Sequence, residues 1–351
     1  MSDSSTIPGA NGHSGKEVSS SKGVTHVLKV LFVRLGVLPI LLLGGIVIFT
    51  LISDNFLTTR NMMNVVRQSS YLTLVAVGQM FALLTGGFDL SVGTIVAVTS
   101  VVGAIAMAAA ATIMPEAVWL SILLGVLAGL AAGGLIGAIN GIGVAIFEVS
   151  PFMMTLGISS VGFGVALYLT GGTPVYGMPV EFGNLFGFGN FFGVPAPVAV
   201  AALVIAAAFV LVNGTRLGRY FYAVGGNLKA ANLSGINTRF TLFMAYLICG
   251  LIAAVSGMLL TARLDTGEAN IGASMPLESI AACVIAGVSL RGGVGRLENV
   301  VLGALFIGLI QNGMNLARID SYLQTVVIGT LLIIAVIADR VRLRVMAEMQ
   351  D

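Results

Sequence analysis

Long apolar runs, separated by short stretches rich in glycine, proline and charge, dominate the chain. The hydrocarbon core of a bilayer is about 30 Å thick, so a helix needs about 20 apolar residues to cross it. Measured against that length, the sequence predicts about ten spans. The eighth is short and flanked by glycines, so we expect a broken or only partly inserted helix there. The ten lie near residues 28–53, 63–85, 91–113, 117–139, 151–170, 196–213, 240–262, 276–290, 297–316 and 322–339.

Charged residues are scarce: they make up 9% of the 351 residues, against 57% for apolar residues. A soluble protein carries about 25% charged residues, so this chain lacks the polar surface that water requires. We therefore expect an all-α, polytopic integral membrane protein in contact with membrane lipid. The formal net charge of +2 gives no reason to expect a nucleic acid as partner.

Side chains suited to catalysis or metal binding are nearly missing from the apolar body of the chain. The two histidines, His13 and His26, precede most of the first span, and Cys249 and Cys283 lie within apolar runs. A zinc site needs several such ligands together, and a Ser-His-Asp site needs a histidine. The sequence also has no GxxxxGKS/T phosphate-binding loop. We predict no catalytic, cofactor or metal site, and no ATP hydrolysis by this chain.

Positive charge gives the expected orientation, because lysine and arginine gather on the cytoplasmic side of membrane proteins. With ten spans and the N-terminus inside, 13 of the 17 Lys and Arg residues lie on inner segments. We expect a disordered, Ser/Gly-rich cytoplasmic tail at residues 1–26. A transmembrane domain at 27–340 and a cytoplasmic tail at 341–351 would follow.

One long basic loop, residues 213–239, lies between spans on the predicted inner side. Gly225 and Gly226 are helix breakers, and Asn227 is placed to cap a short helix at 228–233. A short helix with small residues at the cytoplasmic face suits docking into a motor domain. By composition, a solvated linker with ordinary inner-side charges fits equally well.

Glycine also marks helix packing and a weak internal repeat. Five glycines from Gly125 to Gly141 recur every four residues on the fourth span, which predicts one face in close contact with another helix. The stretch GGLIGAINGIG (133–143) ends the fourth span and resembles GALFIGLIQNG (303–313), which ends the ninth. The two ends would face opposite sides of the membrane, as inverted-topology repeats do.

Three motifs resemble those of ribose-type ABC sugar permeases. They are GGFDLSVG at 86–93, G-R-x-x-x-A-x-G-x-N-x-x-A-A-x-x-S-G-I at 218–236, and AGVSLRGGVG at 286–295. Their order and spacing match over about residues 40–340. In these motifs and their spacing, the chain resembles permease subunits of bacterial importers for ribose-, xylose-, arabinose- or galactose-like sugars.

The resemblance implies an assembly in the bacterial inner membrane with both termini cytoplasmic. The expected partners are a second permease (as a homo- or heterodimer), a cytoplasmic ABC ATPase, and a periplasmic or lipid-anchored sugar-binding protein. It also implies that residues 219–235 form the coupling helix that contacts the ATPase. The expected coupling residues are Gly218, Arg219, Gly226, Asn227, Ala230, Ala231, Ser234 and Gly235.

Three polar residues at span ends are candidates for the translocation pathway. Asp89 follows the second span, and Asn140 and Asn312 end glycine-rich spans. A carboxylate at membrane depth is costly and is therefore a functional candidate. Asp89 is also spaced to cap the third span by accepting from the backbone of Ser91 or Val92. The asparagines could equally hydrogen-bond sugar hydroxyls or a neighbouring helix.

The predicted outer loop at 171–197 is rich in glycine, proline and aromatic residues. It suits an ordered surface that receives the binding protein, or an interfacial re-entrant segment. Two other functions fit the topology: a permease of a branched-chain amino-acid ABC importer, and an ion-coupled secondary transporter. The latter would need a relay of acids or histidines within the spans, and we find none placed centrally there.

Overall fold

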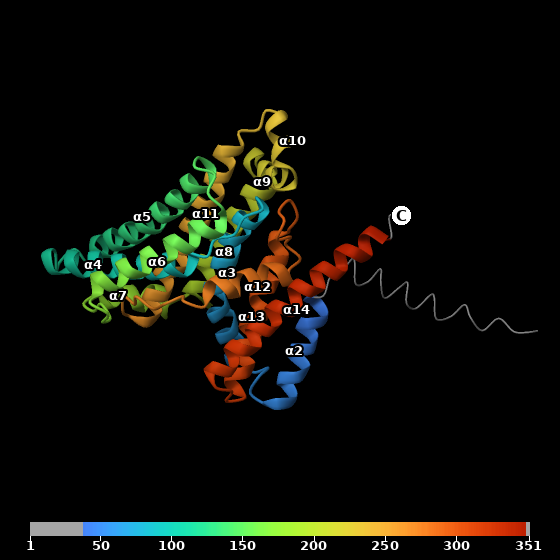
Figure 1. The fold of residues 1–351 in the computed structure, drawn as a ribbon. Helices are drawn as coiled ribbons and strands as arrows, with labels where there is room; N and C mark the ends of the chain where they lie inside the picture. The colour runs from blue at the N-terminus through green and yellow to red at the C-terminus, as the bar shows by residue number, and fades with distance from the viewer. Residues whose placement is uncertain (1–37, 349–351) are drawn as a thin grey trace, which may run out of the picture.

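The computed structural model describes residues 38–348 (Figure 1), and its described part is almost entirely helical. Ten helices coincide with the ten predicted spans, and shorter elements fill the two longest connections. The predicted tail at 1–26, the start of the first span and residues 349–351 lie outside the described residues. The ten helices are α2 (Leu38–Ile52), α3 (Thr59–Leu84), α4 (Val92–Ile113), α5 (Val118–Ala145), α6 (Pro151–Thr170), α8 (Ala196–Gly214), α11 (Thr238–Leu264), α12 (Met275–Ile285), α13 (Leu297–Leu316) and α14 (Ser321–Glu348).

Six of these helices, α4, α5, α6, α8, α11 and α13, are long and apolar enough to cross a membrane. Shorter apolar helical stretches lie at 41–52, 275–285 and 321–337. Helix α3 has 26 residues, but its first half carries arginine, asparagine, glutamine and serine. The polytopic helical fold is thus confirmed, whereas the number of complete crossings stays a prediction.

Helix α11 packs against α3, α4 and α5, and small residues along these contacts let the backbones approach closely. A Cβ added at Gly137 would lie 2.7 Å from the carbonyl oxygen of Tyr246 on α11, and one at Gly129 would lie 3.0 Å from that of Thr99 on α4. The glycine stripe of α5 is therefore a packing surface, as its spacing predicts.

The connections 85–91, 146–150, 215–237 and 286–296 meet on one face of the molecule, which we call the α10 face. It carries two short helices, α9 (Arg216–Gly226) and α10 (Leu228–Leu233). Figure 1 shows them at the opposite end from α7 (Val180–Phe182), which lies in the connection between α6 and α8. That connection also holds a π-helical turn, η1 (Gly183–Gly187), and a hairpin of β1 (Asn190–Phe191) with β2 (Val194–Pro195). The α10 face has six basic residues on these connections or beside them: Arg216, Arg219, Lys229, Arg239, Arg291 and Arg296.

Helix α12 has 11 residues, which is about 16 Å and too short to cross a bilayer alone. The expectation of a broken eighth span is confirmed. Residues 265–274, which join α11 to α12, form turns and no helix. They descend beside α4: the N–H of Glu268 donates to Ser100 Oγ at 3.1 Å. A Cβ on Gly93 would also strike the carbonyl oxygen of Gly272. At the C-terminal end of the chain, the backbone of α14 continues to Glu348, beyond the predicted end of the transmembrane domain at residue 340.

Candidate functional site

Two capped helices form the predicted coupling loop. Thr215 Oγ1 accepts from the N–H of Gly218 at 3.1 Å and begins α9. Asn227 Oδ1 accepts from the N–H of Ala230 at 2.9 Å and begins α10. Gly235 follows with a left-handed φ of +81°, which glycine adopts without strain. The Asn227 cap and the extent of α10 are confirmed. The interruption falls after Gly226, so the loop holds two helices in place of one.

Exposure divides the eight expected coupling residues into two groups. Gly218 and Ala231 are buried: a Cβ on Gly218 would strike the carbonyls that end α8, and Ala231 is 4% exposed. These two residues therefore hold the loop together and do not face a partner. The remaining six are exposed: Arg219, Gly226, Asn227, Ala230, Ser234 and Gly235.

Two leucines on α10 were not among the residues expected from sequence. Leu233 is 90% exposed and Leu228 is 48% exposed. The sequence could have indicated them, because two leucines in a loop of small and polar residues outside the spans have no hydrophobic core to join. Exposed apolar residues on a short helix beside basic residues are typical of a protein-docking surface.

A glycine junction ties the α10 face to the membrane helices. It consists of Gly86, Gly225, Gly226, Gly292 and Gly293, which come from all three family-like motifs. The N–H of Gly293 donates to the carbonyl of Leu84, the last residue of α3, at 2.9 Å. A Cβ on Gly292 would lie 2.7 Å from the backbone nitrogen of Gly86, and one on Gly225 would strike the Leu84 carbonyl. Backbone therefore packs directly on backbone here, and no side chain fits between the three segments.

Two aromatic residues of α9 reinforce this junction. Phe221 is fully buried and packs edge-to-face on Phe81 of α3, with ring centroids 5.5 Å apart. The hydroxyl of Tyr222 donates to the Gly295 carbonyl at 2.9 Å. Burial raises the pKa of Tyr222, with a further increase from Glu298 and an opposing effect of Arg296. The hydroxyl therefore keeps its proton near neutral pH and remains a donor.

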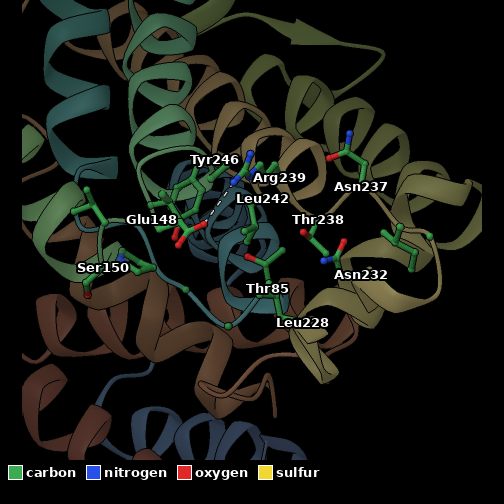
Figure 2. Close-up of a pocket in the computed structure, with 18 residues that line it drawn as sticks. Thr85, Glu148, Ser150, Leu228, Asn232, Asn237, Thr238, Arg239, Leu242 and Tyr246 are labelled. Carbon is green, nitrogen blue, oxygen red and sulfur yellow. Dashed lines mark ion pairs between the residues drawn. The ribbon is translucent and has the colours of Figure 1, made fainter. Parts of the chain in front are cut away.

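A pocket of about 790 Å³ opens between α10 and the helix bundle (Figure 2). Figure 2 shows Glu148 and Arg239 facing one another across it, with 3.7 Å between the carboxylate and the guanidinium. Both side chains are exposed, and exposed ion pairs contribute little to stability. Tyr246 of α11 lines the inner end, and within the described residues its buried hydroxyl has no hydrogen-bond partner.

Asp89 and Asn140 come together in one buried cluster. The N–H and the hydroxyl of Ser91 donate to Asp89 Oδ1, at 2.8 and 2.6 Å. Asn140 Nδ2 donates to Ser91 Oγ at 2.7 Å and lies 3.3 Å from Asp89 Oδ2. With its amide oriented to match its neighbours, Gln79 of α3 pairs with the backbone of Asp89 through two bonds of 3.0 Å. Asp89 thus accepts from the backbone of Ser91 as expected, but the N-cap residue of α4 is Ser91, whose own side chain does not cap that helix, so Asp89 closes a turn just before it.

Asn312 lies apart from that cluster. Its amide pairs with the amide of Asn61 through two hydrogen bonds of 2.9 and 3.0 Å, so α13 is joined to the first turn of α3. The exposed fraction is 0% for Asp89 and Asn140 and 8% for Asn312. All three side chains are thus engaged with protein in this structure, and their role in a pathway stays a prediction.

The connection between α6 and α8 forms an ordered surface on the face opposite α10. Residues Val175 and Gly267 pair through backbone bonds of 2.9 Å, and the guanidinium of Arg263 lies 4.7 Å from the ring centroid of Phe188. Phe192, at the tip of the hairpin, is fully exposed. Among the described residues, no cluster of His, Cys, Asp or Glu could hold a metal ion.

Comparison with known proteins places these features in context. A family model described as "Branched-chain amino acid transport system / permease component" matches residues 61–336. The ribose import permease protein of Escherichia coli (strain K12) is 39% identical over 86% of this chain and 92% of its own length. The D-allose transport system permease protein of the same strain is 36% identical over 82% and 85%. The galactose/methyl galactoside import permease protein of that strain is 33% identical over 86% of this chain and 92% of its own length. No solved structure matches.

Proposed function

Given that the chain belongs to the family of the branched-chain amino acid transport system permease component, we propose that it is the membrane subunit of an ATP-driven importer that carries a monosaccharide. Support comes from the relatives just described, which are permeases for ribose, allose and galactose and cover more than four fifths of this chain. An amino-acid substrate is not favoured by these relatives. An ion-coupled secondary transporter is not favoured either, because the relatives are import permeases.

In the proposed orientation the α10 face is cytoplasmic, and both termini lie on that side of the bacterial inner membrane. Six of the basic residues lie on this face or beside it, and the positive-inside rule supports the assignment. A reporter fused after Arg344 should give a cytoplasmic signal, whereas one inserted within 171–194 should give a periplasmic signal. The reverse result would contradict the orientation.

The surface that contacts the ATPase is, in this proposal, the exposed side of α10. The observation that carries it is Leu233, which is 90% exposed beside Ala230 on a capped helix. The glycine junction would pass movement of α9 and α10 to the end of α3 and the start of α4. The chain's own contribution to ATP hydrolysis is this mechanical contact, since the catalytic subunit is a separate chain.

The test compares charges placed on the exposed side of α10 with a charge placed on the opposite face of the molecule. Ala230→Glu and Leu233→Asp should abolish pull-down of the ATPase and sugar uptake while leaving membrane insertion and melting unchanged. An unpaired charge in an apolar interface costs several kcal/mol, which would weaken docking at least about a hundredfold. Tyr176 lies in the connection between α6 and α8, on the opposite face, and is 68% exposed. Tyr176→Glu is the matched control and should bind the ATPase normally.

Ala231→Glu separates the two roles further. Because Ala231 is buried, this change should unfold the loop itself and lower the melting temperature. If Ala230→Glu and Leu233→Asp both retained the ATPase, α10 would be a linker and not a docking helix.

We also propose that the hairpin tip at Phe192 receives the sugar-binding protein. Its ring is fully exposed, while neighbouring residues of the loop pack onto α11. Phe192→Asp should therefore weaken stimulation of the ATPase by the sugar-loaded binding protein without changing the basal ATPase rate. Undiminished stimulation would exclude this contact.

A further inference from the structure

A second, smaller pocket lies between the start of α4, the middle of α6 and the turns that lead into α12. Its volume is about 290 Å³, at the small end of ligand pockets. The polar residues among those that line it are Thr94, Ser159, Ser160 and Asn270, and Phe163 is its aromatic residue. Thr94 Oγ1 lies 3.0 Å from the carbonyl of Ser159 and 3.1 Å from its hydroxyl, so α4 and α6 are joined at this point.

The pocket lies within the depth of the helix bundle, because Thr94 is the third residue of α4 and Ser159 lies in the middle of α6. Helix α6 has 20 residues, which is about 30 Å and matches the thickness of the hydrocarbon core. Ser159 and Ser160 are its ninth and tenth residues, so they lie at the midpoint of the span. Their hydroxyls have partners in the protein: Ser159 meets Thr94, and Ser160 Oγ donates to the carbonyl of Leu156 at 3.3 Å. The oxygen of Ser160 can still accept a further hydrogen bond.

The third wall of the pocket is irregular backbone at the same depth. Residues 265–274 form turns, and within them Asn270, Ala273 and Ser274 are exposed. Unpaired backbone groups are not stable against lipid, and such segments occur only where protein covers them or where they line a water-filled cavity. This face of the molecule therefore borders either an aqueous pathway or a second protein.

The chemistry of the lining suits a neutral polyol. Hydroxyl and amide groups can both donate to and accept from sugar hydroxyls, and the ring of Phe163, 41% exposed, offers an apolar surface to a sugar face. None of the residues that line the pocket is charged. A zwitterionic amino acid would leave its carboxylate and ammonium unpaired here, at a cost of several kcal/mol each.

We propose that this pocket is a low-affinity subsite for the monosaccharide on its way through the membrane, an inference that rests on the function proposed above. Its open side and small number of polar groups suit a conduit, which must release its cargo. Thr94 also connects the subsite to the junction: α4 begins directly after Gly86–Ser91, so movement of the junction shifts one wall of the pocket.

The experiment uses the complete importer, with its ATPase and binding protein, in proteoliposomes. Both native cysteines are buried, so Ser160→Cys adds a single accessible thiol. A membrane-impermeant methanethiosulfonate should label Ser160→Cys. The transported sugar should slow that labelling, with ribose, allose and galactose tried in turn. Val161 is 62% exposed and does not line the pocket; Val161→Cys is the matched control outside the pocket and should stay unlabelled.

A transport measurement accompanies the labelling. Asn270→Ala removes one hydrogen-bonding group and should lower sugar uptake up to about tenfold, while stimulation of the ATPase by the loaded binding protein stays unchanged. Uptake by Val161→Ala should match the unmodified chain.

The outcomes separate the subsite from the function on which it rests. If the unmodified importer carries an amino acid and none of the three sugars, the proposed function fails. The subsite alone fails if sugar uptake is normal in Asn270→Ala and the Ser160→Cys thiol is unreactive or unprotected. A disulfide between the Ser160→Cys thiols of two permeases, without labelling, would make this face a dry interface and overturn the subsite.

Discussion

The two asparagine clusters lie at opposite ends of α3 and are built differently. Near the α10 face, the amide of Asn140 donates to the hydroxyl of Ser91 and lies beside the carboxylate of Asp89, which accepts from Ser91. Gln79 bonds to the backbone of Asp89. At the far end, Asn312 and Asn61 pair as two neutral amides, and Asn61 Nδ2 also donates to the carbonyl of Phe56. The first cluster joins α3, α4 and α5, whereas the second joins α3 and α13.

The two clusters should differ in how much stability is lost when one side chain is removed. A carboxylate that loses its donors remains buried and unpaired, which is among the most costly events in a protein interior. Loss of one member of an amide pair leaves one neutral group unpaired, and removal of both leaves only the carbonyl of Phe56 without its donor. The end of α3 near Asp89 should therefore be the more fragile of the two.

The largest effect is expected for Asn140→Asp. It would put a second carboxylate about where Nδ2 now lies 3.3 Å from Asp89 Oδ2, and two carboxylates at that distance repel one another. We expect a loss of about 3 kcal/mol in stability, measured as a lower melting temperature in detergent. The exchange Asp89→Asn with Asn140→Asp should restore most of it. A double variant no more stable than Asn140→Asp would show that the pair is not interchangeable.

A smaller effect is expected for Asn312→Leu. The change leaves the buried Asn61 amide without this partner, although Asn61 Nδ2 still donates to the carbonyl of Phe56 at 2.8 Å. One unpaired buried amide costs about 1–3 kcal/mol. Because the pair lies away from the α10 face, sugar uptake per folded molecule should remain near normal. A loss as large as that of Asn140→Asp would remove the contrast between the two clusters.

The smallest effect is the coupling free energy between Asn61 and Asn312. The double variant Asn61→Leu with Asn312→Leu should lose less stability than the sum of the losses of the two single variants. Replacing both partners of a hydrogen-bonded pair by apolar groups can be nearly neutral. A double-mutant cycle should therefore show a favourable coupling of about 1 kcal/mol between the two residues. Additive losses would mean that each amide acts through other neighbours.

Local features of this fold could be predicted from the sequence, whereas contacts between distant segments could not. The positions of the ten helices follow from apolar length, and the Asn227 cap follows from its place before a short helix. Nothing local indicated that Asp89 and Asn140, 51 residues apart, meet, or that three motifs converge on one glycine junction. The burial of Ala231 also could not be predicted from the sequence, because it depends on how the loop folds back on the helix bundle.

The sugar subsite illustrates the same limit. Ser159 and Ser160 were part of an apolar run and gave no separate signal, since a serine in a helix can bond its own backbone. Their significance comes from the turns at 265–274, which only the folded chain brings to the middle of α6.

The Asn61–Asn312 pair has a consequence for how the protein is made. Its members are 251 residues apart, and at roughly 5–20 residues per second the ribosome takes roughly 10–50 seconds to reach the second after the first. During that time the polar first turn of α3 lacks the amide that later pairs with it. We therefore expect Asn61, near the start of α3, to stay hydrated until α13 has been made and the two helices pack together.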